Sequence, residues 1–267
     1  MNLKTEEAKK YIKRQKIYNL KIIISRILLL IGFLFLWQFL SSNELINSFL
    51  FSSPKAIFNL IIQYVKTGEI FNHIYISIYE TILGLVIGTS LGIILAIILW
   101  WNKTLAKIME PFLVVLNALP KTALAPIFII WAGTGIKGIV VVAISISLIL
   151  TIISAYNYFK NIDEEKIKML KSFGANKQQI LTKLVLPSNI VNLVDIVKIN
   201  IGMSWVGVIM GEFIVSRAGI GYLIVYGSQI FKLDLVMMGV FILAVIAYIM
   251  YQMINLLEKA LKNKLSK

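Results

Sequence analysis

Two lysines lie inside long apolar runs, where a cation could attract a negatively charged solute. Lys121 follows Pro120, and Lys198 lies three residues after Asp195. An ammonium group at membrane depth costs about 3 kcal/mol unless it reaches water or a partner. For Lys198 we favour pairing with Asp195 within one helix over direct contact with a solute. Lys121 either lines a path or supports the proline kink. Candidate path residues are Pro120, Lys121, Lys198 and Ser204.

The sequence contains no pattern of residues typical of a catalytic, metal-binding or nucleotide-binding site. The chain has no cysteine, which excludes disulfides and thiolate sites, and its one histidine, His73, is too little for a metal site. It contains no G-x-x-x-x-G-K-[ST] phosphate loop and no combination of nucleophile and base. The sequence therefore predicts no enzyme, no cofactor and no metal.

A polar, lysine-rich segment from Asp163 to Pro187 separates two apolar runs. It holds two short amphipathic helix patterns that meet at Gly174, where a left-handed turn is favoured. Asn176 and Gln179 match a capping box for the second helix. We expect this shape to bind in a groove of a partner protein. The residues expected at that contact are Ile167, Leu170, Phe173, Gly174, Ala175, Leu184 and Pro187.

The elements around these residues are membrane-spanning helices. Hydrophobic residues make up 58% of the 267 and charged residues only 15%, which fits an all-α integral membrane protein. A spanning helix needs about 20 mostly apolar residues. Six such runs are predicted: Ile22–Leu40, Ser77–Trp100, Ile108–Ala132, Gly138–Phe159, Ile190–Glu212 and Leu235–Leu257. The first run is too long for a cleavable signal peptide and lacks a cleavage site.

The net charge of +14 has a distribution typical of membrane topology, not of nucleic-acid binding. Nineteen of the 27 lysines and arginines fall in segments assigned to the cytoplasm, and five fall outside. This asymmetry predicts cytoplasmic termini in the cell membrane, with lipid attraction secondary. The expected parts are the tail 1–21, a first transmembrane helix 22–40, an outer segment 41–76 with a short surface helix, a core 77–257 with the loop 160–187, and the tail 258–267.

Glycine and proline mark two of the spans. Gly84, Gly88, Gly92 and Ala96 recur every four residues, which predicts a flat helix face for close packing against another helix. Pro111, Pro120 and Pro126 interrupt the third span. Broken helices persist at membrane depth where the freed carbonyls face protein or a wet cavity.

The loop resembles the EAA loop of binding-protein-dependent ABC importer permeases. Gly174 and Pro187 have the motif's spacing, and Leu184 and Leu186 occupy its hydrophobic positions, whereas the EAA triplet is replaced by Lys168–Leu170. The segments "LNALPKTALAPIFIIWAGTGIKGIVVV" and "SWVGVIMGEFIVSRAGIGYLI" are similar to the nitrate/sulfonate/taurine branch. The resemblance covers roughly residues 52–260.

This resemblance implies a type I importer fold with the loop as a cytoplasmic coupling helix. It implies an ABC ATPase subunit, an extracytoplasmic solute-binding protein and a second permease copy, expected as a homodimer. The implied solute is a small anion such as a sulfonate, taurine, nitrate or bicarbonate, or alternatively a thiamine-precursor pyrimidine or riboflavin. A transporter driven by an ion gradient is less favoured, because the chain is short and shows no internal repeat.

Overall fold

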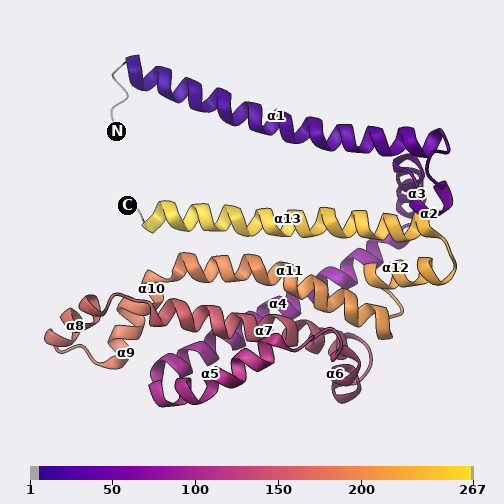
Figure 1. The fold of residues 1–267 in the computed structure, drawn as a ribbon. Helices are drawn as coiled ribbons and strands as arrows, with labels where there is room; N and C mark the ends of the chain where they lie inside the picture. Colours follow the sequence, from indigo (N-terminus) through magenta and orange to yellow (C-terminus); the bar gives the residue numbers. More distant parts are fainter. Residues whose placement is uncertain (1–5, 266–267) are drawn as a thin grey trace.

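The computed structural model describes residues 6–265, and over this range the chain is built from helices (Figure 1). The ends of the two expected tails, residues 1–5 and 266–267, lie outside the described residues. The elements are α1 Glu6–Ser42, α2 Ser48–Phe51, α3 Pro54–Thr67, α4 Glu69–Trp101, α5 Lys103–Ala118, α6 Ala125–Ala132, α7 Ile136–Lys160, α8 Glu164–Ser172, α9 Lys177–Ile180, the π-helix Leu181–Val185, α10 Leu186–Ser188, α11 Ile190–Val215, α12 Ile220–Gln229 and α13 Leu233–Leu265.

Five of these helices are long and apolar enough to cross a membrane. They contain the ranges Lys10–Ser42, Glu69–Trp101, Ile136–Lys160, Ile190–Val215 and Leu233–Asn263. Between the second and third of them the chain runs through α5 and α6, which are each shorter than a span. The expected run Ile108–Ala132 is therefore two helices separated by a turn.

The break between α5 and α6 has a local cause. The residue before a proline is driven to extended backbone, and Leu119, directly before Pro120, has φ −65° and ψ 137°. Pro126 stands in the first turn of α6, where a missing amide is tolerated. The expected interruption at Pro111 is wrong, because α5 continues through this residue. Only Pro120 ends a helix here.

Helices α4, α7 and α11 form the centre of the bundle through the predicted small-residue face. A Cβ added at Gly84 would lie 2.6 Å from the Cβ of Ala143, and one added at Gly92 would lie 2.5 Å from the Cβ of Thr151. A Cβ added at Gly207 of α11 would lie too close to the Cα of the same Ala143. The close packing expected of the glycine series is confirmed.

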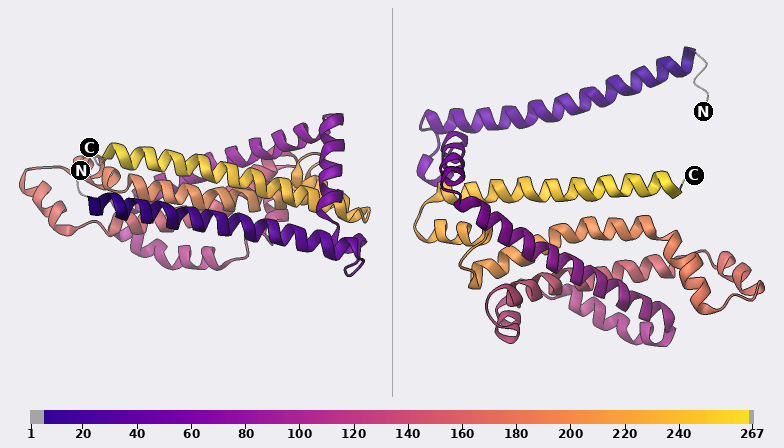
Figure 2. Two further views of the ribbon diagram at one scale, coloured as in Figure 1. Left: turned by 90° about the horizontal axis from the view of Figure 1, so that it is seen from above. Right: turned by 180° about the vertical axis from the view of Figure 1, so that it is seen from behind.

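The two ends of the bundle differ in content. The start of α1, the end of α13 and the α8–α9 segment lie at one end, and α2, α3 and α12 lie at the other (Figures 1 and 2). Helix α1 lies apart from α13 over most of its length in Figure 1 and in the right-hand view of Figure 2. None of the apolar window of α1 is buried within the chain.

Candidate functional site

The loop between α7 and α11 folds as a helix, a sharp turn and a second helix. Asp163 accepts a hydrogen bond from the Glu165 amide at the start of α8. Gly174 then takes φ +80° in the left-handed region, as expected for a turn that ends a helix. The capping box is confirmed, since Asn176 and Gln179 bond each other's backbone amides at 2.8 Å.

The loop is fixed to the bundle by an apolar inner face. Ile167, Leu170, Ala175 and Leu184 are partly buried against the chain's own residues. A further tie comes from Lys177, which donates to the Trp101 carbonyl and lies 5.3 Å from the centre of its ring. The residues of the receiving cluster come from α4, α7, α9, the π-helix and α11: Ala96, Ala155, Phe159, Ile180, Leu181, Val185 and Ile196.

The outer face of the loop presents a different apolar residue. Phe173 is 79% exposed and Met169 is 53% exposed, whereas Ile167 and Leu170 point into the bundle. Gly174 and Pro187 are also exposed. The structure thus divides the contact set expected from the sequence. Phe173, Gly174 and Pro187 are exposed, whereas Ile167, Leu170, Ala175 and Leu184 pack against the bundle.

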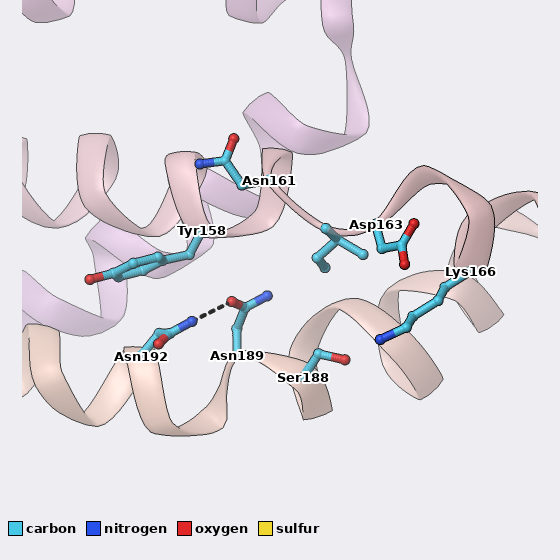
Figure 3. Close-up of a pocket in the computed structure, with 8 residues that line it drawn as sticks. Tyr158, Asn161, Asp163, Lys166, Ser188, Asn189 and Asn192 are labelled. Carbon is cyan, nitrogen blue, oxygen red and sulfur yellow. Dashed lines mark hydrogen bonds between the residues drawn. The ribbon is translucent and has the colours of Figure 1, made fainter.

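A polar cavity of about 250 Å³ lies beside the loop (Figure 3). It opens between the end of α7 and the start of α11. Among its lining residues, the side-chain oxygen of Asn189 accepts a hydrogen bond from the side-chain amide of Asn192 at 2.8 Å. The side-chain amide of Asn189 donates one to the Val185 carbonyl at 2.9 Å. Its lining residues are Tyr158, Asn161, Ile162, Asp163, Lys166, Ser188, Asn189 and Asn192. Its polar groups are three side-chain amides, the hydroxyls of Tyr158 and Ser188, and one charge of each sign.

Lys121 lies in the turn that separates α5 from α6. Its ammonium group donates to the Asn117 carbonyl at 3.2 Å and to the Asn117 side-chain oxygen at 3.4 Å. The turn itself is closed by the Ala123 amide bonding the Pro120 carbonyl at 2.8 Å. Both interpretations of Lys121 fit this arrangement, because neutral oxygens leave the positive charge uncompensated while fixing the side chain on α5.

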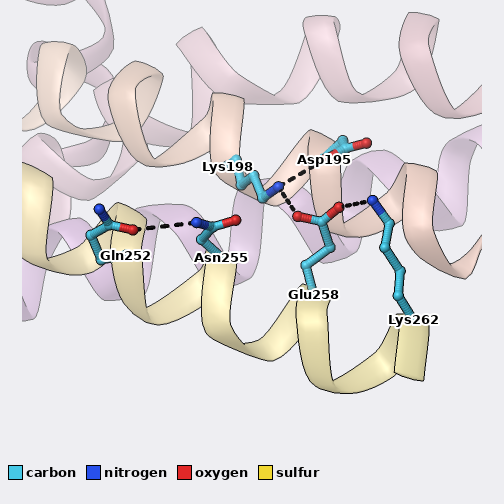
Figure 4. A network of polar contacts seen from close by, with 6 residues as sticks. All are labelled: Asp195, Lys198, Gln252, Asn255, Glu258 and Lys262. Atoms are coloured by element: carbon cyan, nitrogen blue, oxygen red, sulfur yellow. Dashed lines mark hydrogen bonds and ion pairs between the residues drawn. The ribbon is translucent and has the colours of Figure 1, made fainter. Parts of the chain in front are cut away.

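Lys198 is part of an ion-pair network that joins α11 to α13 (Figure 4). The predicted pair is confirmed, with the ammonium nitrogen 3.1 Å from the Asp195 carboxylate. Lys198 also pairs with Glu258 of α13, which in turn pairs with Lys262. Sequence reasoning missed Glu258, although an acidic residue late in the last apolar run was a visible signal.

Ser204 is fully buried in this chain, on a face of α11 other than that of Lys198. One turn earlier, Asn200 donates to Thr89 of α4 at 2.8 Å and to Thr151 of α7 at 2.7 Å. Residues four apart share a helix face, so Ser204 lies towards α4 and α7, whereas Lys198 lies towards α13. The structure therefore does not bring Ser204 and Lys198 together.

The chain is similar to known transport proteins over most of its length. The family model described as "Binding-protein-dependent transport system inner membrane component" matches residues 88–263. A putative aliphatic sulfonates transport permease from Bacillus subtilis is 25% identical over 85% of this chain and 82% of its own. The taurine transport system permease of Escherichia coli is 21% identical over 84% of each chain. The riboflavin transport system permease of Chloroflexus aurantiacus is 31% identical over 59% of each chain.

Solved structures give the fold independently. A chain of the MetNI methionine ABC transporter in an inward-facing conformation aligns with a TM-score of 0.64 and 16% identity. The alignment covers 72% of this chain and 95% of that chain. The chain described here belongs to the family of binding-protein-dependent transport system inner membrane components, as an ABC importer permease of the nitrate/sulfonate/taurine branch.

Proposed function

We propose that the chain is the membrane-spanning subunit of an ATP-driven importer that carries a small solute across the cell membrane. The observation that supports this most is the exposed Phe173 on a loop whose inner face is fixed to the bundle. A rigid protrusion with an aromatic tip is suited to a groove on a partner protein. The sequence has no phosphate loop, so a separate ATPase subunit must supply the energy.

The experiment that tests this proposal is affinity purification of the chain from its native membrane in mild detergent. We expect an ABC ATPase with a G-x-x-x-x-G-K-[ST] loop to copurify, with two permease copies and two ATPase copies per complex. A solute-binding protein is expected to join when solute is added. Recovery of the chain without any ATPase, under conditions where other importers of the same membrane remain assembled, contradicts the proposal.

Helix α1 supports the presence of a second permease copy. Its apolar run is long enough to span the membrane, yet none of the residues in that window is buried within its own chain. It is attached to the rest of the chain through α2 and α3 (Figure 1). Packing α1 against another copy of the permease would cover one side of this helix with protein instead of lipid. A homodimer is therefore part of the proposal.

The orientation of the chain in the membrane is inferred from the basic residues at one end of the bundle. The start of α1, the end of α13 and the α8–α9 loop share one end, and most of the basic residues belong to the N-terminal, loop and C-terminal segments of the sequence. We infer that this end faces the cytoplasm. The chain has no cysteine, so single cysteines at Ser172 and Ser228 can be labelled in intact cells with an impermeant reagent. Labelling at residue 228 and not at 172 is expected, and the reverse pattern refutes the orientation.

The translocation path is proposed to pass the α5–α6 turn, with Pro120 and Lys121 in its wall and Lys198 and Ser204 as further candidates. Lys121→Met removes the charge and keeps an unbranched side chain that is only one heavy atom shorter. We expect uptake to fall about tenfold or more while the amount of assembled complex stays normal, because an unpaired ammonium attracts an anionic solute. A loss of assembled complex at unchanged uptake per complex shows instead that Lys121 supports the turn.

The chemical class of the solute rests on the relatives. Those named for sulfonates and taurine favour an anion, as does the charge of Lys121. Relatives named for riboflavin and formylaminopyrimidine support the alternative of a neutral heterocycle. Competition of radiolabelled taurine uptake by sulfonates, nitrate, bicarbonate, riboflavin and formylaminopyrimidine separates the two classes.

A further inference from the structure

The first turn of α12 is fixed by side chains from other helices. The four leading amides of a helix have no partner within it, and the N-cap residue here, Gly219, has no side chain to help. The Gly219 amide donates to His73 Nδ1 at 2.9 Å, and the Ile220 amide donates to the Ser77 hydroxyl at 2.7 Å. Both acceptors belong to α4, which therefore holds the start of α12.

Glu212 of α11 completes this arrangement. One carboxylate oxygen accepts the Gly221 amide at 2.5 Å. The other oxygen accepts the Ser77 hydroxyl at 2.5 Å. A Cβ at Gly221 would lie 2.8 Å from a carboxylate oxygen, so only glycine allows this approach. The residue is 2% exposed, so three helices converge on one buried carboxylate.

Glu80 of α4 lies against Glu212 and is 1% exposed. The two side chains lie within hydrogen-bonding reach of each other, and two carboxyl groups can share a hydrogen bond only if one of them holds a proton. Two adjacent buried carboxylates would repel each other without compensation. All ion pairs among the described residues include Lys198 or Glu258, so none of them compensates this pair.

The hydrogen bonds decide which residue carries the proton. Glu212 accepts from the Gly221 backbone amide and the Ser77 hydroxyl, and such donors stabilise a carboxylate. Glu80 has one oxygen without any partner within the described part of the chain, and its contact is with Glu212. These contacts favour Glu80 as the neutral acid of the pair, with Glu212 as the carboxylate.

We propose that Glu212 is the positioning residue that anchors the start of α12 between α4 and α11, and that Glu80 supports it as a neutral, proton-donating acid. The pair fixes the end of the bundle opposite the α8–α9 loop, where the solute would enter under the proposed function. The anchor can be examined in the purified chain without a solute or an ATPase. Its failure is therefore distinguishable from failure of the proposed function.

Infrared spectroscopy of the purified chain at neutral pH tests whether Glu80 is protonated. The spectrum is expected to contain the C=O band of a buried protonated carboxylic acid, and the band is expected to disappear in Glu80→Gln and to remain in Glu212→Gln. Absence of the band in the unmodified chain means that both groups are ionised, as they would be around a bound cation, and overturns the proposal. Loss of the band in Glu212→Gln alone overturns the assignment of the proton.

The reaction rate of a buried cysteine in α12 tests whether Glu212 holds the start of this helix in place. Leu223 of α12 is 3% exposed, so Leu223→Cys is expected to react slowly with a thiol reagent. Adding Glu212→Gln should raise its reaction rate about tenfold or more, because hydrogen bonds from the helix start to a charged group are lost. Adding Glu80→Gln should change the rate less than threefold, since an amide still donates to Glu212.

A second thiol separates local opening from global unfolding. Val142→Cys lies in α7, is fully buried, and is expected to stay protected in both glutamine variants. Equal reaction rates of Leu223→Cys in the Glu80→Gln and Glu212→Gln backgrounds overturn the proposal. Exposure of Val142→Cys together with Leu223→Cys in Glu212→Gln also overturns it, because the residue would then support the whole bundle and not α12.

Discussion

Phe173→Ala is expected to weaken the association of the chain with its ATPase subunit by about 30-fold or more. Phe173 is 79% exposed on the outer face of the loop, where Met169 is the other large apolar residue, at 53% exposed. Exposed aromatic residues that enter a partner's pocket contribute about 2 kcal/mol or more to binding, which corresponds to this factor. The fold of the chain should not change, since Phe173 makes little contact with it. Titration of the ATPase onto permease in nanodiscs measures the effect.

Phe231→Ala is the matched control for this prediction. Phe231 is 71% exposed and follows α12, at the end of the bundle opposite the loop. Its removal is expected to leave ATPase binding unchanged. Equal binding by the unmodified chain and by Phe173→Ala contradicts the docking surface proposed here. Equal weakening by both variants shows a general effect of removing exposed aromatic area.

Gly207→Ala is expected to destabilise the chain, whereas Gly202→Ala in the same helix is not. A Cβ at Gly207 would lie 2.9 Å from the Ala143 nitrogen and 3.2 Å from its Cβ, and backbone cannot move aside easily. Overpacking of this kind costs about 1–3 kcal/mol. A Cβ at Gly202 meets nothing within 4 Å, so alanine there gains up to about 1 kcal/mol of helix propensity.

Thermal unfolding of the two purified variants in the same detergent measures this difference. The melting temperature should fall for Gly207→Ala and stay constant or rise for Gly202→Ala. A fall of similar size in both variants would mean that any side chain on α11 is harmful, and the close contact between α11 and α7 would then not explain the effect.

Features that depend on local spacing were predictable from the sequence. The capping box of Asn176 and Gln179 and the pair of Asp195 and Lys198 involve residues three apart, whose geometry a helix fixes. The Gly84 series predicted close packing because small residues four apart allow it. The partner helix, α7, was not predictable, since many sequences present a surface that fits such a face.

Features that depend on distant partners were missed. Glu258 meets Lys198 across 60 positions, and Glu212 meets Ser77 across 135. No sequence spacing fixes such a contact, although buried carboxyl groups in apolar runs were a signal that partners must exist. The loop shows the same limit, because a stripe of Ile167, Leu170 and Phe173 does not tell which residues pack on the chain itself.

The claim that the chain is the membrane subunit of an ATP-driven importer is tested most directly by measuring which energy source drives uptake. The chain, its copurified ATPase and its solute-binding protein are reconstituted into proteoliposomes, and uptake of labelled solute is measured with ATP on the ATPase side. Uptake is expected to require ATP and the ATPase, to be unaffected by ionophores that collapse ion gradients, and to stop when the catalytic lysine of the ATPase phosphate loop is replaced. Uptake by the chain alone that follows an imposed ion gradient and needs no ATP would contradict the account.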